Sequence, residues 1–129
     1  ATARFEASLK VRERLAETNP GSAEAQRDLS VSMERLGDVL VKAGDLSGAT
    51  ARFEASLKVS ERLAETNPGS AEAQRDLIVS YAKLGEVVPH QGWWSRGLAV
   101  CERLAAEGRL APTDAWMLDE LRERAAGEA

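Results

Sequence analysis

The sequence has few of the residues that usually carry chemistry. It contains one cysteine and one histidine, and aromatic residues make up only 5% of its 129 positions. A single cysteine excludes an internal disulfide and fits a reducing compartment. One histidine and one cysteine cannot complete a tetrahedral metal site, so we expect no metal and no cofactor.

Long apolar runs and an excess of basic charge are also missing. No run approaches the roughly 18 residues that a bilayer span needs, and we expect no signal segment ahead of Ala1. We therefore expect a cytoplasmic protein without a membrane partner. Lys and Arg number 17 against 21 Asp and Glu, with the two signs interspersed. Nucleic-acid binders gather basic residues on one face, so no nucleic acid is expected as a partner. The abundance of arginine and alanine fits a GC-rich bacterial genome.

What the sequence does contain is an internal repeat. Residues 3–40 return as residues 51–88, with a period of 48 residues and with 31 of the 38 paired positions identical. In repeat arrays one unit cannot bury its apolar face alone, and stacking on its neighbours supplies the core. This organisation favours a binding scaffold over an enzyme and leaves the partner open.

Each repeat predicts a helical hairpin. After the break at Pro20-Gly21, a second break at Gly44 divides the repeat into two segments. In each segment apolar residues recur every three or four positions. The first carries Leu29, Met33, Leu36 and Leu40, and the second carries Leu46, Ala49, Phe53 and Leu57. Ser22 stands where a helix N-cap is wanted, and Gly44 suits a C-terminal stop. We expect an all-α fold of antiparallel hairpins with about six helices, of roughly 20 residues each in the repeats.

The repeat resembles the tetratricopeptide repeat. The resemblance rests on Leu36-Gly37, Leu40, Gly44, Ala49 and Phe53, which match the family's pattern of small and large positions. A unit of that family has about 34 residues, and we interpret the extra residues here as one added heptad on each helix, which keeps the same face toward the core. The resemblance implies an α-solenoid that acts as a non-catalytic protein–protein interaction scaffold.

These patterns divide the chain into four segments of a single repeat domain. Residues 1–18 form a partial repeat, 19–66 a full repeat, 67–107 a degenerate repeat and 112–127 a capping helix. Because Phe5, Leu9 and Leu15 repeat Phe53, Leu57 and Leu63, the first helix is expected to lack cover on one flank. An exposed apolar patch attracts a partner, so a homo-oligomer through this truncated N-terminal helix is predicted. Similar bacterial arrays are often attached to signalling domains.

The degenerate repeat has lost seven residues. Its ERLA string begins at Glu102, 41 residues after Glu61 instead of 48. Pro89 should end the first helix near Val88, and the second helix, about 95–106, should be two turns short. Trp93 and Trp94 could then cover the space that the missing heptad leaves, or form an aromatic platform for a ligand.

The final helix is expected to follow a cap at Thr113. Trp116, Leu118 and Leu121 would form its apolar side, with charged residues on the solvent side. A polar outer face is typical of the helix that terminates an array.

The resemblance places a partner-binding groove on the first helix of each unit. The matching positions carry both apolar and charged side chains: Glu24, Arg27, Val31, Glu34, Asp38, Val41, Lys42, Val79, Ala82 and Glu86. Glu34 and Asp38 would favour a basic or amphipathic peptide over an acidic one. Two alternatives stay open. The same stripe could be an ordinary solvated face in an array whose role is structural or self-associating, or Cys101 with His90 could form a nucleophilic pair.

Overall fold

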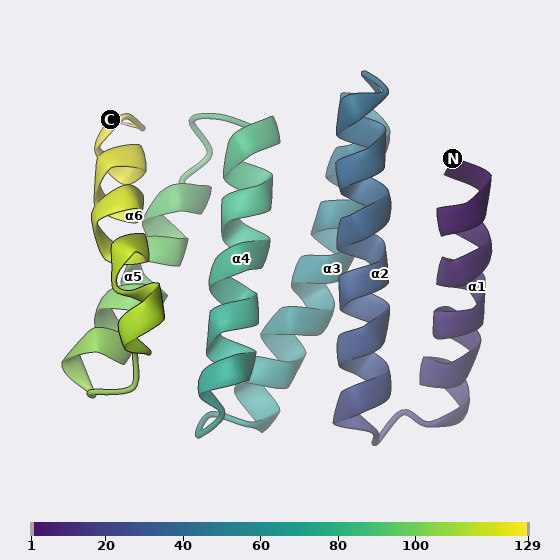
Figure 1. The fold of residues 1–129 in the computed structure, drawn as a ribbon, viewed down its shortest axis with the longest axis horizontal. Helices are drawn as coiled ribbons and strands as arrows, with labels where there is room; N and C mark the ends of the chain where they lie inside the picture. Colours follow the sequence, from purple (N-terminus) through teal and green to yellow (C-terminus); the bar gives the residue numbers. More distant parts are fainter. Residues whose placement is uncertain (1, 129) are drawn as a thin grey trace. The chain divides into compact units, whose positions relative to one another are not determined.

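The computed structural model describes residues 2–128, which form six α-helices and one short 3-10 helix, with no strand among them (Figure 1). The elements are α1 (Thr2–Thr18), α2 (Ala23–Lys42), α3 (Leu46–Thr66), α4 (Ala71–Val87), α5 (Trp93–Ala106), η1 (Pro112–Asp114) and α6 (Trp116–Ala126). This confirms the all-helical class. A solenoid built from hairpins stays a prediction.

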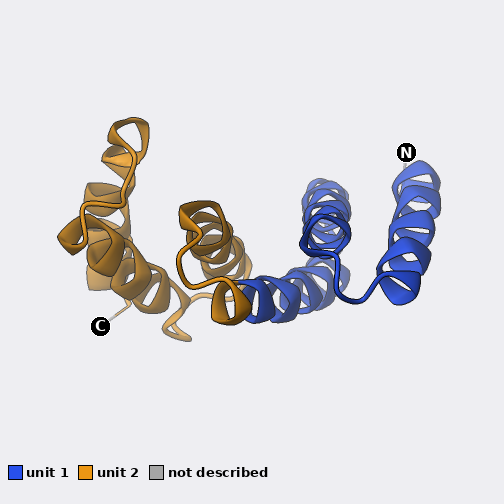
Figure 2. Ribbon diagram, turned by 90° about the horizontal axis from the view of Figure 1, so that it is seen from below, with its two compact units in different colours: residues 1–63 blue, residues 64–129 orange. Residues whose placement is uncertain are grey.

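The chain divides into two compact units, residues 1–63 and residues 64–129 (Figure 2). The boundary falls in the last turn of α3, close to the predicted repeat boundary at 66–67. The assignment of all 129 residues to one repeat domain stays a prediction.

Local sequence explains where the helices begin and end. The hydroxyl of Ser22 accepts a hydrogen bond from the Ala25 amide, at 3.1 Å, and Ser70 does the same for Ala73. These N-caps satisfy amides that have no partner inside the helix. Gly44 follows α2 with φ of +84°, a left-handed conformation that favours glycine. With 20 residues in α2 and 21 in α3, the first full repeat has the predicted long helices.

One apolar cluster of the first unit lies between α1 and α2, which pack side by side. Its buried residues are Leu9, Ala16, Leu29 and Leu36, with Phe5, Met33, Leu40 and Val59 packed around them. The expectation that this side of α1 lacks cover on one flank is wrong for Leu9, which is 2% exposed and packs in this cluster, whereas Phe5 is half-buried. Leu15 does remain exposed, at 44%. Association through α1 stays a prediction.

Three buried serines join α2 to α3 inside the first unit. The Ser30 hydroxyl lies 2.7 Å from that of Ser56 and 3.2 Å from that of Ser60, and Ser56 donates to the Ser30 carbonyl at 3.0 Å. Each buried hydroxyl therefore has a partner, as buried polar groups require. When the two repeats are aligned with the seven-residue deletion taken into account, the three serines correspond to Ile78, Gly97 and Cys101 in the second unit. The same junction is therefore apolar there.

The deleted heptad shortens α5 to 14 residues, against 21 for α3. The helix α4 ends at Val87, one residue before the predicted end, and α5 begins at Trp93 instead of 95. Trp94 takes the position that Phe53 has in the first repeat. Each ring packs over the glycine of its own Leu-Gly pair, Phe53 over Gly37 and Trp94 over Gly85.

The final helix differs from the prediction in its start and in its buried face. Pro112 to Asp114 form a 3-10 turn, and no side chain caps α6, so the expected cap at Thr113 is wrong. The helix buries Met117 and Leu121, whereas Trp116 is 63% exposed and Leu118 is half-buried. The extra turn sets where α6 begins, and with it which residues face α5.

Candidate functional site

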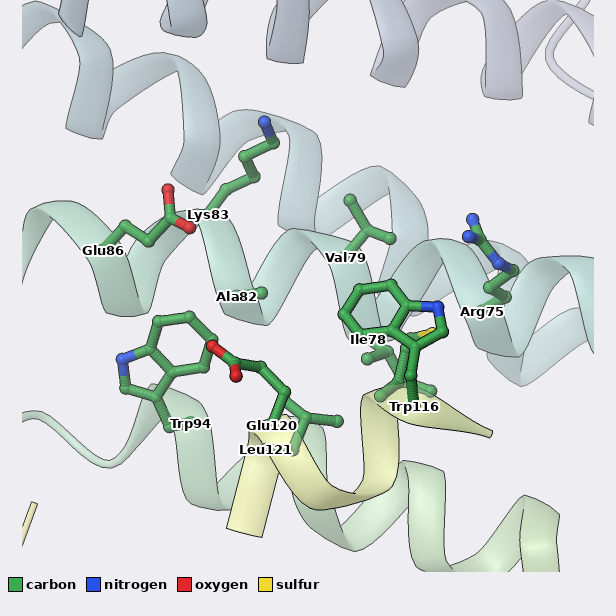
Figure 3. Close-up of a pocket in the computed structure, with 11 residues that line it drawn as sticks. Arg75, Ile78, Val79, Ala82, Lys83, Glu86, Trp94, Trp116, Glu120 and Leu121 are labelled. Atoms are coloured by element: carbon green, nitrogen blue, oxygen red, sulfur yellow. The ribbon is translucent and has the colours of Figure 1, made fainter. Parts of the chain in front are cut away.

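An apolar hollow in the second unit lies between α4 and α6, with Trp94 of α5 at one end (Figure 3). We call it the α4–α6 slot. Its volume is about 220 Å³, and its lining is mostly apolar with four charged residues. The lining residues are Arg75, Ile78, Val79, Ala82, Lys83, Glu86, Trp94, Trp116, Met117, Glu120 and Leu121.

Trp94 forms a fixed wall of the slot. Its side chain is only 7% exposed, and a Cβ atom added to Gly85 would lie 2.6 Å from its ring atoms. The guanidinium carbon of Arg124 lies 4.9 Å from the centroid of the Trp94 ring, in a cation–π contact. Glycine on one helix and arginine on another therefore hold this indole in place.

Trp116 forms the open wall. It is the first residue of α6 and is 63% exposed, so it lines the slot while keeping much of its ring in water. Exposed tryptophans are uncommon, and tryptophan is among the residues most often found at the energetic centres of interfaces.

On the side of the slot, α4 carries a small residue at the position where α2 carries a large charged one. Ala82 is the repeat counterpart of Glu34, and Ala82 lines the slot. Glu34 is instead half-buried and accepts a hydrogen bond of 3.4 Å from the buried Ser56 hydroxyl. A glutamate at position 82 would occupy the space that the slot provides.

The charges around the slot are partly compensated. Arg75 donates to Asp114 at 2.9 Å, and Arg124 donates through Nε to Oε1 of Glu120 at 3.0 Å. Figure 3 shows the Glu120 carboxylate beside the Trp94 ring, on the side toward Trp116, whereas the ammonium of Lys83 points away from both rings. Glu86 lies near the C-terminal end of α4, where the helix dipole adds further negative potential.

The predicted groove residues fall into two sets. Val79, Ala82 and Glu86 on α4 come together in the slot. The others lie along α2 in the first unit, where Glu24 and Lys42 are exposed and the remainder are half-buried: Arg27, Val31, Glu34, Asp38 and Val41. Their role in binding a partner stays a prediction.

Sequence reasoning missed the contribution of α6 to this site. The sequence pattern places Trp116 on the apolar side of its helix, and it places the charged residues, Glu120 among them, on the solvent side. The signal that could have found Trp116 is Pro112, which favours a tight turn ahead of the helix and so shifts its start.

The structure argues against Cys101 as a nucleophile. Its side chain is 0% exposed, and His90 lies in the exposed loop after α4. Burial raises the pKa of the Cys101 thiol, the carboxylates of Asp114 and Glu102 raise it further, and Arg122 opposes them. A catalytic thiol needs the opposite shift, because the thiolate is the nucleophile.

Among residues 2–128 no group of three or more His, Cys, Asp or Glu side chains is arranged to hold a metal ion. Within the same range, no helix combines the length and the apolar character that a bilayer crossing demands.

Comparisons with known proteins give no relative for this chain. No family model, no curated protein and no solved structure matches it.

Proposed function

We propose that this protein is a non-catalytic scaffold of tetratricopeptide-like helical hairpins, and that it binds a protein or peptide partner in the α4–α6 slot. The lining of the slot supports this proposal. It joins an apolar floor to an exposed tryptophan, the combination that anchors partner side chains at protein interfaces.

One observation carries the proposal. The two copies of the repeat differ at seven of 38 positions, and four of those seven line the slot: Ile78, Ala82, Lys83 and Glu86. The other 31 positions are identical. Divergence gathered at one hollow, within an almost identical stretch of sequence, is the pattern expected of a surface with a function of its own.

A selection experiment tests the proposal. Random 16-residue peptides displayed on phage are selected on the parent protein, and the binders are then measured against Ala82→Glu. This substitution restores the residue of the first repeat and fills the slot. Ala99→Glu is the matched control, because it makes the same change on an exposed part of α5 that does not line the slot.

Selected peptides should bind Ala82→Glu at least about tenfold more weakly than the parent, since an anchor pocket residue commonly carries 1–2 kcal/mol or more of binding energy. Binding to Ala99→Glu should be unchanged. Peptides that bind all three proteins equally would place the site elsewhere. A selection that yields no binder would favour the alternative of a structural array.

A further inference from the structure

We propose that the α4–α6 slot selects a basic segment of a partner protein, in which the apolar stem of a lysine or arginine enters between Trp94 and Trp116 and its charged end meets Glu120. This inference rests on the proposed function and specifies the chemistry of the partner. It is carried by the arrangement of charge inside the slot.

The carboxylate of Glu120 is the central element. It lies beside the Trp94 ring, on the side toward Trp116 (Figure 3), and Arg124 donates a hydrogen bond to its Oε1 atom. A carboxylate can accept several hydrogen bonds through its two oxygens, so Glu120 keeps capacity for a second cation. Its side chain is 42% exposed, which leaves it accessible to a ligand.

The other charges of the slot also favour a positively charged ligand. The guanidinium of Arg75 is paired with Asp114 at 2.9 Å, and the ammonium of Lys83 is directed away from the indoles (Figure 3). Glu86 adds a second carboxylate to the lining. Glu120 is itself paired with Arg124 through one oxygen, so an entering cation meets Glu86 and the other Glu120 oxygen, whereas an anion meets cations that are paired or turned away.

The aromatic walls add a third contribution. The Trp94 ring already holds the guanidinium of Arg124 at 4.9 Å, which shows that a cation is accommodated against this indole. Trp116 presents an exposed ring at the opposite wall. A long aliphatic stem ending in a cation suits such a slot, since lysine and arginine pack their stems on apolar surface while the charged end stays polar.

Three small probes with the same apolar part test this chemistry: phenethylammonium, phenethyl alcohol and hydrocinnamate, which are positive, neutral and negative at neutral pH. Binding is followed by NMR through the indole N–H signals of Trp94 and Trp116. Trp93 is the internal control, because it stacks on Tyr81 with ring centroids 6.2 Å apart and does not line the slot.

Glu120→Gln removes the charge at nearly constant shape, and Glu123→Gln removes one from an exposed position of α6 outside the slot. In the parent, the ammonium should bind about two- to fivefold more tightly than hydrocinnamate, the range expected for a partly exposed ion pair. Glu120→Gln should bring the two affinities within about twofold, Glu123→Gln should preserve the preference, and added salt should shrink it.

The outcomes separate this inference from the proposed function. Equal or stronger binding of hydrocinnamate to the parent, or a preference that survives Glu120→Gln, would overturn the charge assignment. The slot itself would still stand if Ala82→Glu abolished binding of all three probes. Absence of any shift at Trp94 and Trp116, or no effect of Ala82→Glu, would overturn both.

Discussion

At the scale of single residues, glycine and a large aromatic ring form a matched pair in each repeat. Phe53 is 2% exposed and packs over Gly37, and Trp94 packs over Gly85 in the same way. The absence of a side chain on each glycine lets the ring approach the helix backbone closely. Gly85 therefore positions the fixed wall of the slot.

We expect Gly85→Ala to lower the free energy of unfolding by about 1–2 kcal/mol. Overpacking a buried site costs about 1–3 kcal/mol, and the better helix propensity of alanine offsets up to about 1 kcal/mol of this. Urea unfolding measures the change. Gly69→Ala is the control, because an added Cβ there meets nothing within 4 Å. Equal stability of the two variants would show that Trp94 does not pack on Gly85.

Cys101 gives a pH prediction at the same scale. Because burial raises its pKa in the folded state, the neutral thiol stabilises the protein at neutral pH. This contribution is lost as the pH rises past the ordinary thiol value, about 8.5, and through the raised one. Urea midpoints should fall more steeply above about pH 9 in the parent than in Cys101→Ala. The native thiol should also react with a thiol reagent at least about tenfold more slowly than the unfolded one. Parallel pH profiles together with rapid native labelling would contradict the assignment.

At the scale of elements, the loss of one heptad from α5 explains why two tryptophans follow the loop. A shorter helix provides fewer side chains to cover α4, and Trp94 compensates by covering Gly85 with a larger ring than Phe53. Trp93 contributes at the edge, half-buried, where it stacks on Tyr81 and holds the guanidinium carbon of Arg96 at 4.9 Å. Of the two roles expected for the pair, covering the missing space fits Trp94, which also forms a wall of the slot.

The two tryptophans should therefore differ in their effect on stability. Trp94→Ala should cost about 3–5 kcal/mol, the range for truncating a buried aromatic residue, whereas Trp93→Ala should cost well under 3 kcal/mol because that ring is only half-buried. Trp94→Phe restores the residue of the first repeat and should recover most of the loss. Thermal and urea unfolding of the three variants measure this order. A larger cost for Trp93→Ala would mean that the heptad deletion is covered in another way.

Helix ends were predictable because they depend on neighbouring residues, as with the cap at Ser22, the stop at Gly44 and the break at Pro89. The buried face of α6 was not, because the 3-10 turn sets where the helix begins and a shift of one residue exchanges Trp116 for Met117 in the core. The slot could not be predicted from the sequence, because it brings together α4 and α6, which are separated in the chain by the whole of α5.

At the scale of the whole molecule, two units built from nearly the same repeat carry different surfaces. In the first unit, the predicted groove residues on α2 include Glu34, which accepts a hydrogen bond from Ser56. In the second unit, Ala82 lines the slot together with Trp116. We expect the partner to bind at the second of these surfaces.

The most direct test is a chemical-shift map of the labelled protein with a peptide selected on the parent. We expect the indole N–H signal of Trp116 and the backbone amide signal of Ala82 to shift most, and the indole signal of Trp93 to stay nearly unchanged. Shifts confined to α2, at residues such as Val31 and Asp38, would contradict it and would move the binding surface to the first unit.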